Sequence, residues 1–226
     1  MKDEKLEIVY ERSFDMLLFD SIETLMRARE FHEFEEIHQT LSRSSVLSSL
    51  LILEAAANTC IESLDLGRSV LGEVDRLPTL SKFDFYLRTR FRDRHLDRGI
   101  SVVEGLRELK SLRDAFVHLK PHRTEWRYNG DSGTAESERT KFLGIARNPK
   151  FLDSSDAIQT MRGTHGFLKY FFKEKCKYGS MRVASLLFSE KKIPSFNGGY
   201  AIPAPPRQIK LLLKEVGVDI SYVKLM

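Results

Sequence analysis

Residues 45–64 are apolar on nearly every face when they are drawn as a helix. The apolar side chains in this segment are Val46, Leu47, Leu50, Leu51, Leu53, Ala55, Ala56, Ala57, Cys60 and Ile61. A helix of this kind must be covered on most sides, which places it in the middle of a bundle. Its longest apolar run, residues 50–57, is interrupted by Glu54 and is too short to span a bilayer. We therefore expect a helical bundle built around this segment.

Further helices are predicted on both sides of the central segment. Residues 13–41 carry apolar side chains at near-helical spacing, which predicts a long first helix with a break near its middle. The polar residues 42–45 are expected to separate it from the central helix and to cap the latter. Residues 67–79 are interpreted as a turn region. Three later segments have helical patterns, at 154–176, 180–190 and 207–216, with Gly217 ending the last.

The helix that precedes Pro121 has the clearest predicted boundaries. Ser101 and Glu104 fit a capping box, in which each side chain binds an otherwise unpaired backbone amide. Proline cannot continue a helix and disfavours a helical residue before it, so this helix must end near His118.

The region after Pro121 has a different character. Residues 126–128 and 141–145 predict two short strands around a polar loop. The fold class expected from the sequence is mainly α, a bundle of four to five helices with a small β-hairpin-like appendage. We expect the bundle over residues 1–178, with the hairpin inserted at about 123–148. Residues 179–226 would form a helical extension packed on it.

Composition favours a cytoplasmic protein. Apolar residues make up 42% of the chain and charged residues 30%, which argues against disorder and against a membrane protein. The first five residues lead into no apolar signal core. Cys60 and Cys176 lie far apart within apolar patterns, as expected for reduced, buried thiols.

The end of the helix before Pro121 carries an arginine, an acid and a histidine. Arg113 and His118 point about 140° apart on a helix, whereas Asp114 and His118 share a face and could interact. The same arginine–histidine spacing occurs at residues 27 and 32 and at residues 90 and 95, so spacing alone is a weak signal. Only the copy at 113 is followed by an acid and closes an amphipathic helix. The alternative interpretation is a helix end stabilised by ion pairs.

Basic and aromatic residues alternate in residues 82–98. Six basic residues stand against three acids there, with three phenylalanines and a tyrosine between them. Such a segment could bind RNA through phosphates and bases. It could equally be a connection whose aromatic rings fill the core while its arginines stay in solvent.

The residues around Arg113 resemble the signature of the HEPN superfamily (higher eukaryote and prokaryote nucleotide-binding domains). That signature is an arginine, a polar residue, three or more further residues and a histidine, matched here by Arg113, Asp114 and His118. An alanine-rich segment at 54–58 and an aromatic-basic segment at 80–83 also precede the motif in the same order. The resemblance covers about residues 13–121. It implies an all-α fold and often a homodimer with two motifs facing across a cleft.

The resemblance further implies a metal-independent endoribonuclease of a toxin–antitoxin or anti-phage defence system. His118 would move the proton of the 2′-hydroxyl, Arg113 would stabilise charge on the phosphorane, and Asp114 would orient both. The products would carry a 2′,3′-cyclic phosphate. Six further residues are candidates for RNA contacts: Glu54, Asn58, Lys82, Arg88, Arg90 and Lys120.

The expected partners are RNA, a second copy of the chain and an antitoxin protein, with no membrane. No cofactor and no metal ligands are expected, because no phosphate loop, zinc spacing or repeated Glu-x-x-His is found. One alternative is a HEPN bundle without catalysis that binds a nucleotide, RNA or a protein. Another is an unrelated helical interaction protein.

Overall fold

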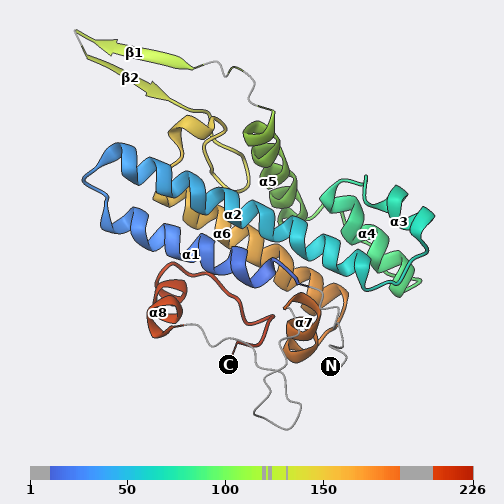
Figure 1. The fold of residues 1–226 in the computed structure, drawn as a ribbon. Coiled ribbons are helices and arrows are strands. Elements are labelled where there is room, and N and C mark those ends of the chain that lie inside the picture. Colours follow the sequence, from blue (N-terminus) through green and yellow to red (C-terminus); the bar gives the residue numbers. More distant parts are fainter. Residues whose placement is uncertain (1–10, 119–120, 122–123, 131, 189–205, 226) are drawn as a thin grey trace, which may run out of the picture.

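Helices dominate the computed structural model, which describes residues 11–118, 121, 124–130, 132–188 and 206–225 (Figure 1). The expectation of a mainly α fold is confirmed. The α-helices are α1 (Phe14–Glu30), α2 (Glu35–Glu62), α3 (Arg68–Val74), α4 (Thr79–Arg90), α5 (Ser101–Val117), α6 (Ser154–Lys169), α7 (Ser180–Leu187) and α8 (Arg207–Glu215). A 3-10 turn (Pro149–Phe151) precedes α6, and a π-helical turn (Tyr170–Lys175) follows it.

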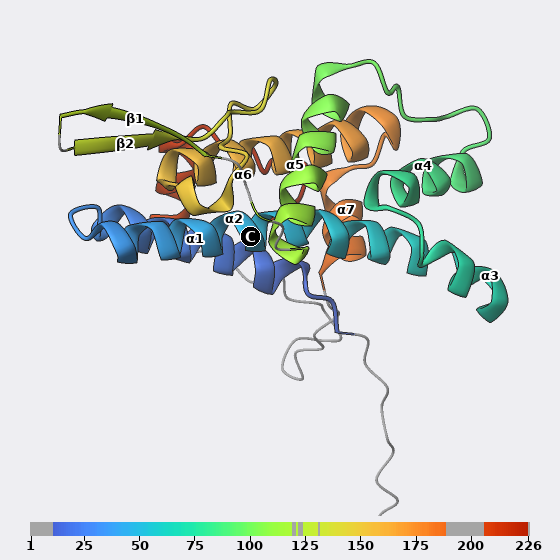
Figure 2. The ribbon, with the colours of Figure 1, turned by 90° about the horizontal axis from the view of Figure 1, so that it is seen from above.

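The apolar central segment lies in the middle of the fold as part of α2. This helix packs against α1, α4, α5, α6 and α7, which cover it on different sides (Figures 1 and 2). Within the described part of the chain, α2 is the one helix long and apolar enough to cross a membrane, and most of that stretch is buried inside the bundle. Burial of this extent is typical of a core helix.

The predicted helix break at residues 42–45 is wrong, because α2 runs through it. The chain turns instead at residues 31–34, near the middle of the expected first helix. Ser42 and Ser45 are fully buried, and the Ser45 hydroxyl donates to the Ser21 carbonyl of α1 across 2.7 Å. Serine hydroxyls can satisfy themselves on backbone carbonyls inside a helix packing as well as at a cap. Their small size also lets α1 approach α2 closely.

Helix α5 ends where the sequence predicts but begins differently. His118 is its C-terminal cap, and the His118 amide donates to the Asp114 carbonyl at 2.9 Å. The predicted capping box is absent, because Ile100 is the N-terminal cap and makes no side-chain capping bond. The Glu104 carboxylate instead pairs with Arg107, one turn further along the helix.

The β-hairpin has one strand in the expected place and one that differs. Strand β1 (Glu125–Asn129) pairs antiparallel with β2 (Ser132–Glu136), and the hairpin extends along one end of the bundle (Figure 2). Residues 141–145, expected as a strand, form a turn. The backbone amides of Phe142 and Leu143 each donate to the Glu108 carboxylate at 2.9 Å. The Leu143 side chain packs where Gly105 of α5 and Gly163 of α6 leave room. Its apolar character thus serves helix packing.

The segment 67–79, expected to be a turn region, contains the short helix α3. This helix has seven residues and buries only Val74, so its sequence shows little helical pattern.

The C-terminal segment docks on α6 through a buried polar contact. Tyr222 is fully buried, and its hydroxyl lies 2.8 Å from Nδ1 of His165, which is also fully buried. The Arg162 guanidinium donates to the Val216 carbonyl at 2.7 Å, and Lys169 pairs with Asp219 at 2.6 Å. These contacts hold α8 and the residues after it against the bundle.

The burial of His165 predicts a loss of stability in mild acid. Burial lowers the pKa of His165 to about 4, below its usual value of about 6.5. Between these pH values the His165 imidazole therefore binds a proton in the unfolded chain but not in the folded chain. Stability should be complete above pH 6.5 and fall as the pH drops towards 4, by up to about 3 kcal/mol.

Urea unfolding at a series of pH values measures this loss. Replacing His165→Leu should flatten the slope of stability against pH in this window by about one proton. The exposed His95, changed in the same way, is the matched control and should leave the slope as in the wild type. An unchanged slope in His165→Leu would assign the acid sensitivity to other groups.

Candidate functional site

Arg113 lies where α5 crosses α2. Its guanidinium is 3.8 Å from the Glu54 carboxylate of α2 and 3.3 Å from the Asp114 carboxylate on its own helix. The side chain of Arg113 is 26% exposed, so the group is held at the edge of the core with one side open to solvent. The structure thus brings together Arg113, Asp114 and Glu54, three of the residues selected from the sequence.

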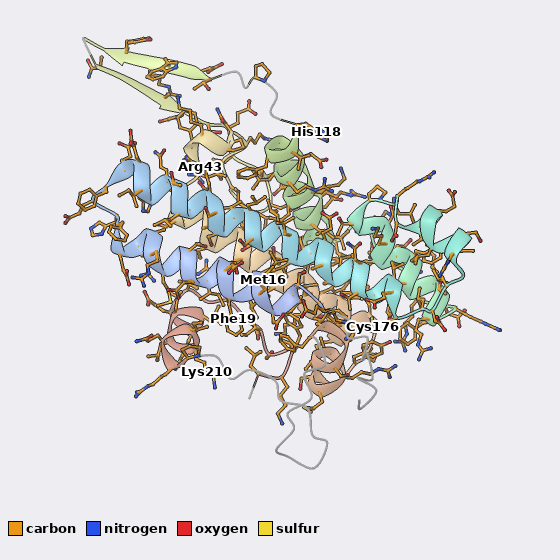
Figure 3. All side chains as sticks on the ribbon, in the orientation of Figure 1. Met16, Phe19, Arg43, His118, Cys176 and Lys210 are labelled. Atoms are coloured by element: carbon orange, nitrogen blue, oxygen red, sulfur yellow. The ribbon has the colours of Figure 1, made fainter. Side chains whose placement is uncertain are left out.

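Asp114 interacts with cations and not with the histidine. The Lys110 ammonium donates to its carboxylate at 2.5 Å. Among the residues that the structure describes, no hydrogen bond joins the Asp114 carboxylate to the His118 imidazole. His118 is exposed at the outer end of α5 (Figure 3). The expected orientation of His118 by Asp114 is therefore not the arrangement present. Lys110 is also one turn from Asp114, and the hydrogen bond between an ammonium and a carboxylate is among the strong, charge-assisted ones.

The cavity beside Arg113 is small. A space of about 30 Å³ lies between α2, α4 and α5, lined by Glu54, Arg113 and mostly apolar side chains. It has room for water and not for a nucleotide. A larger depression of about 380 Å³ lies along α5 against residues 140–147, and neither Arg113, Asp114 nor His118 lines it. A phosphate reaching Arg113 and His118 would consequently approach over the open surface.

Asn58 and Lys82 form a second pair one turn from Glu54. The Lys82 ammonium donates to the Asn58 side-chain oxygen at 2.7 Å, and the lysine is 6% exposed. Lys82 therefore connects α4 to α2, and its charge is held by an amide. This contact provides a structural role for both residues.

In the aromatic-basic segment, residues 82–98, aromatic rings fill the core while arginines stay in solvent. Phe83 and Tyr86 are buried in the core and offer no face for stacking a base. Arg88 is exposed and pairs with Asp84 at 2.9 Å, and Arg90 is exposed at the far end of α4. The twelve residues of α4 place Arg90 about 17 Å from the helix start near Arg113. Lys120 lies outside the described residues.

Two contacts at this site were not foreseen from the sequence. Lys110 stands four residues before Asp114, a spacing at which opposite charges pair on a helix, so this signal was readable. The contact between Arg113 and Glu54 depends on how α5 crosses α2, which no local pattern reports.

No family model, curated protein or solved structure matches this chain.

The Asn58–Lys82 pair predicts unequal effects of two substitutions on stability. Asn58→Ala removes the only side chain described as holding the Lys82 ammonium, and should cost about 1–3 kcal/mol. Lys82→Met replaces the charge with a flexible apolar chain of similar length and should be nearly neutral. Chemical denaturation of the two variants and the double variant measures the coupling. If Asn58→Ala retains full stability, the pair has no structural role.

Proposed function

We propose that this protein is a metal-independent endoribonuclease of the HEPN type. The observation that supports this best is the placement of Arg113, which Glu54 and Asp114 hold at the edge of the core, just before His118 at the exposed end of α5. A fixed guanidinium on the same helix end as a histidine in solvent suits a reaction that needs charge stabilisation and proton transfer at a phosphodiester.

In the proposed reaction the 2′-hydroxyl of the RNA attacks its own 3′-phosphate. His118 accepts the hydroxyl proton as the O–P bond forms, and the bond to the 5′-oxygen of the next nucleotide breaks. Arg113 stabilises the charge that develops on the phosphorane oxygens. Asp114, paired with Arg113 and Lys110, positions the guanidinium. The leaving 5′-oxygen takes up a proton, and the other product has a 2′,3′-cyclic phosphate.

A second copy of the chain would complete this site. The cavity at Arg113 is too small to enclose a phosphodiester, so one wall of the binding cleft has to come from elsewhere. We propose a homodimer whose two motifs face each other, so that one His118 takes the proton and the other returns one. The proposed setting is a cytoplasmic toxin or anti-phage defence system, with an antitoxin protein as a further partner.

A non-catalytic bundle that binds a nucleotide, RNA or a protein is the second candidate. It is favoured by the contact between Asp114 and Lys110, because within the described residues this carboxylate then does not orient His118. The two candidates differ in whether RNA is cut.

The first test is RNA cleavage in the presence of EDTA. The wild type should cut single-stranded RNA and leave 2′,3′-cyclic phosphate ends. His118→Ala should lower the rate by about 10²–10⁴-fold through loss of proton transfer. Arg113→Ala should lower it by about 10²–10³-fold through loss of charge stabilisation.

The chain supplies matched controls for this test. His32 and His95 each follow an arginine at the same spacing as His118, and both are exposed. His32→Ala and His95→Ala should cleave as the wild type does. If the wild type and both motif variants leave the RNA equally intact, the proposal of catalysis is wrong and the non-catalytic binding function takes its place.

The contacts of Asp114 predict that it affects charge stabilisation by Arg113 and not proton transfer by His118. Because its carboxylate touches Arg113 and Lys110, Asp114→Asn should lower kcat by about tenfold through a misplaced guanidinium. The position of the rate profile along the pH axis should stay the same. A rate profile displaced along the pH axis would show instead that Asp114 acts directly on the histidine.

A further inference from the structure

A second depression, of about 200 Å³, lies at the opposite end of α4 from Arg113. The end of α4 lines it with Arg90, the end of α2 with Ser63, and α7 with Arg182 and Ser185. Tyr86 and Tyr178 form its inner wall, and none of the described residues lining it is acidic. The hollow is therefore rich in hydrogen-bond donors and positive charge.

Arg90 and Arg182 form no ion pair with any carboxylate of the residues that the structure describes. Within the described ranges, the arginines of the surface commonly pair with an acid, as Arg29 does with Glu215 and Arg88 with Asp84. Neither Arg90 nor Arg182 has such a pair there. Arg182 is nevertheless held in place, because its guanidinium stacks 4.0 Å from the centre of the Tyr178 ring. Arg12 also lines the hollow, and its guanidinium donates to the Ser185 and Phe188 carbonyls. Like charges that converge on one hollow repel each other unless an anion joins them.

The two tyrosines supply a hydroxyl hydrogen for which the described residues offer no acceptor. Tyr86 and Tyr178 are 3% and 6% exposed, and their hydroxyl oxygens are 2.8 Å apart. One hydroxyl donates to the other, so the second hydrogen remains, and no acceptor for it is present in the described part of the chain. Burial, and then the bond to Tyr178, raises the pKa of Tyr86, so that its hydroxyl keeps its proton at physiological pH. Buried donors of this kind are normally satisfied by a partner.

The fold builds this wall with an irregular piece of backbone. The π-helical turn at Tyr170–Lys175 is followed two residues later by Lys177, whose φ of 60° is unusual for a residue with a side chain. The turn is closed by the Tyr178 amide, which donates to the Phe172 carbonyl at 2.9 Å. This reversal sets the Tyr178 ring between Arg182 and the core. π-Helical turns are frequent at functional sites.

We propose that this hollow, the Arg90–Arg182 pocket, binds the phosphate group of a small phosphate monoester. Guanidinium groups match the geometry of phosphate oxygens, and a hydroxyl donor adds a third direction of approach. Arg90 and Arg182, which have no acid partner among the described residues, suit a phosphate monoester with about −1.5 to −2 charges at pH 7 better than a carboxylate with one. The volume admits the phosphate and the adjoining part of a small molecule. The proposal does not depend on ribonuclease activity.

Titration calorimetry on the full chain tests the site with two small probes, orthophosphate and a nucleoside 5′-monophosphate. We expect both to bind, whereas chloride at equal ionic strength gives no saturable signal. Arg90→Gln and Arg182→Gln should each weaken binding of the monophosphate by about tenfold or more, since each removes a charged hydrogen bond. Tyr178→Phe should weaken it less.

Arg92→Gln is the matched control, because this arginine is exposed just beyond α4 and does not line the pocket. The melting temperature of each variant without ligand checks that it is folded. The proposal is overturned if millimolar phosphate gives no binding to the wild type, or if Arg92→Gln weakens binding as much as Arg90→Gln. Binding of a 5′-phosphorylated RNA oligonucleotide alone, with no binding of the small probes, would overturn it in favour of an RNA end.

Discussion

The covering of α2 on most of its faces is the constraint on which the remaining structure depends. Because this helix has almost no polar face, α1, α4, α5, α6 and α7 all have to pack against it. Each of them is thereby placed relative to the others. The side of α2 with polar residues, at Glu54 and Asn58, is the side on which Arg113 of α5 and Lys82 of α4 meet it. The candidate site is thus a consequence of how the core is covered.

The sequence predicted the elements whose limits are set by local chemistry. Pro121 follows the end of α5, and Gly217 follows α8 with a φ of 65°, so both helix ends are recognisable without the fold. The errors concern residues whose partners are distant in sequence. A buried serine and a capping serine look alike until Ser21 is seen beside Ser45. Leu143 resembles a strand residue until the gap between two helices that it fills is known.

The same distinction applies to the motif. The sequence identified Arg113, Asp114 and His118 and the end of the helix that carries them, but it assigned Asp114 to the wrong neighbour. Lys110 and His118 are each one turn from Asp114, on either side, and the carboxylate selects the charged partner. The position of Arg113 depends on Glu54 of another helix, so only the packing of α5 on α2 could establish it.

The two arginine sites differ in how their charge is balanced. At the motif, the cations Lys110 and Arg113 face the acids Asp114 and Glu54, so little net charge remains to attract an RNA backbone. In the proposed reaction Arg113 must exchange part of its contact with carboxylates for contact with phosphate. This exchange is least favourable for a phosphodiester with one charge and most favourable for a phosphorane with more. An arginine restrained in this way contributes less to binding the substrate than to stabilising the transition state, which is the condition for raising kcat.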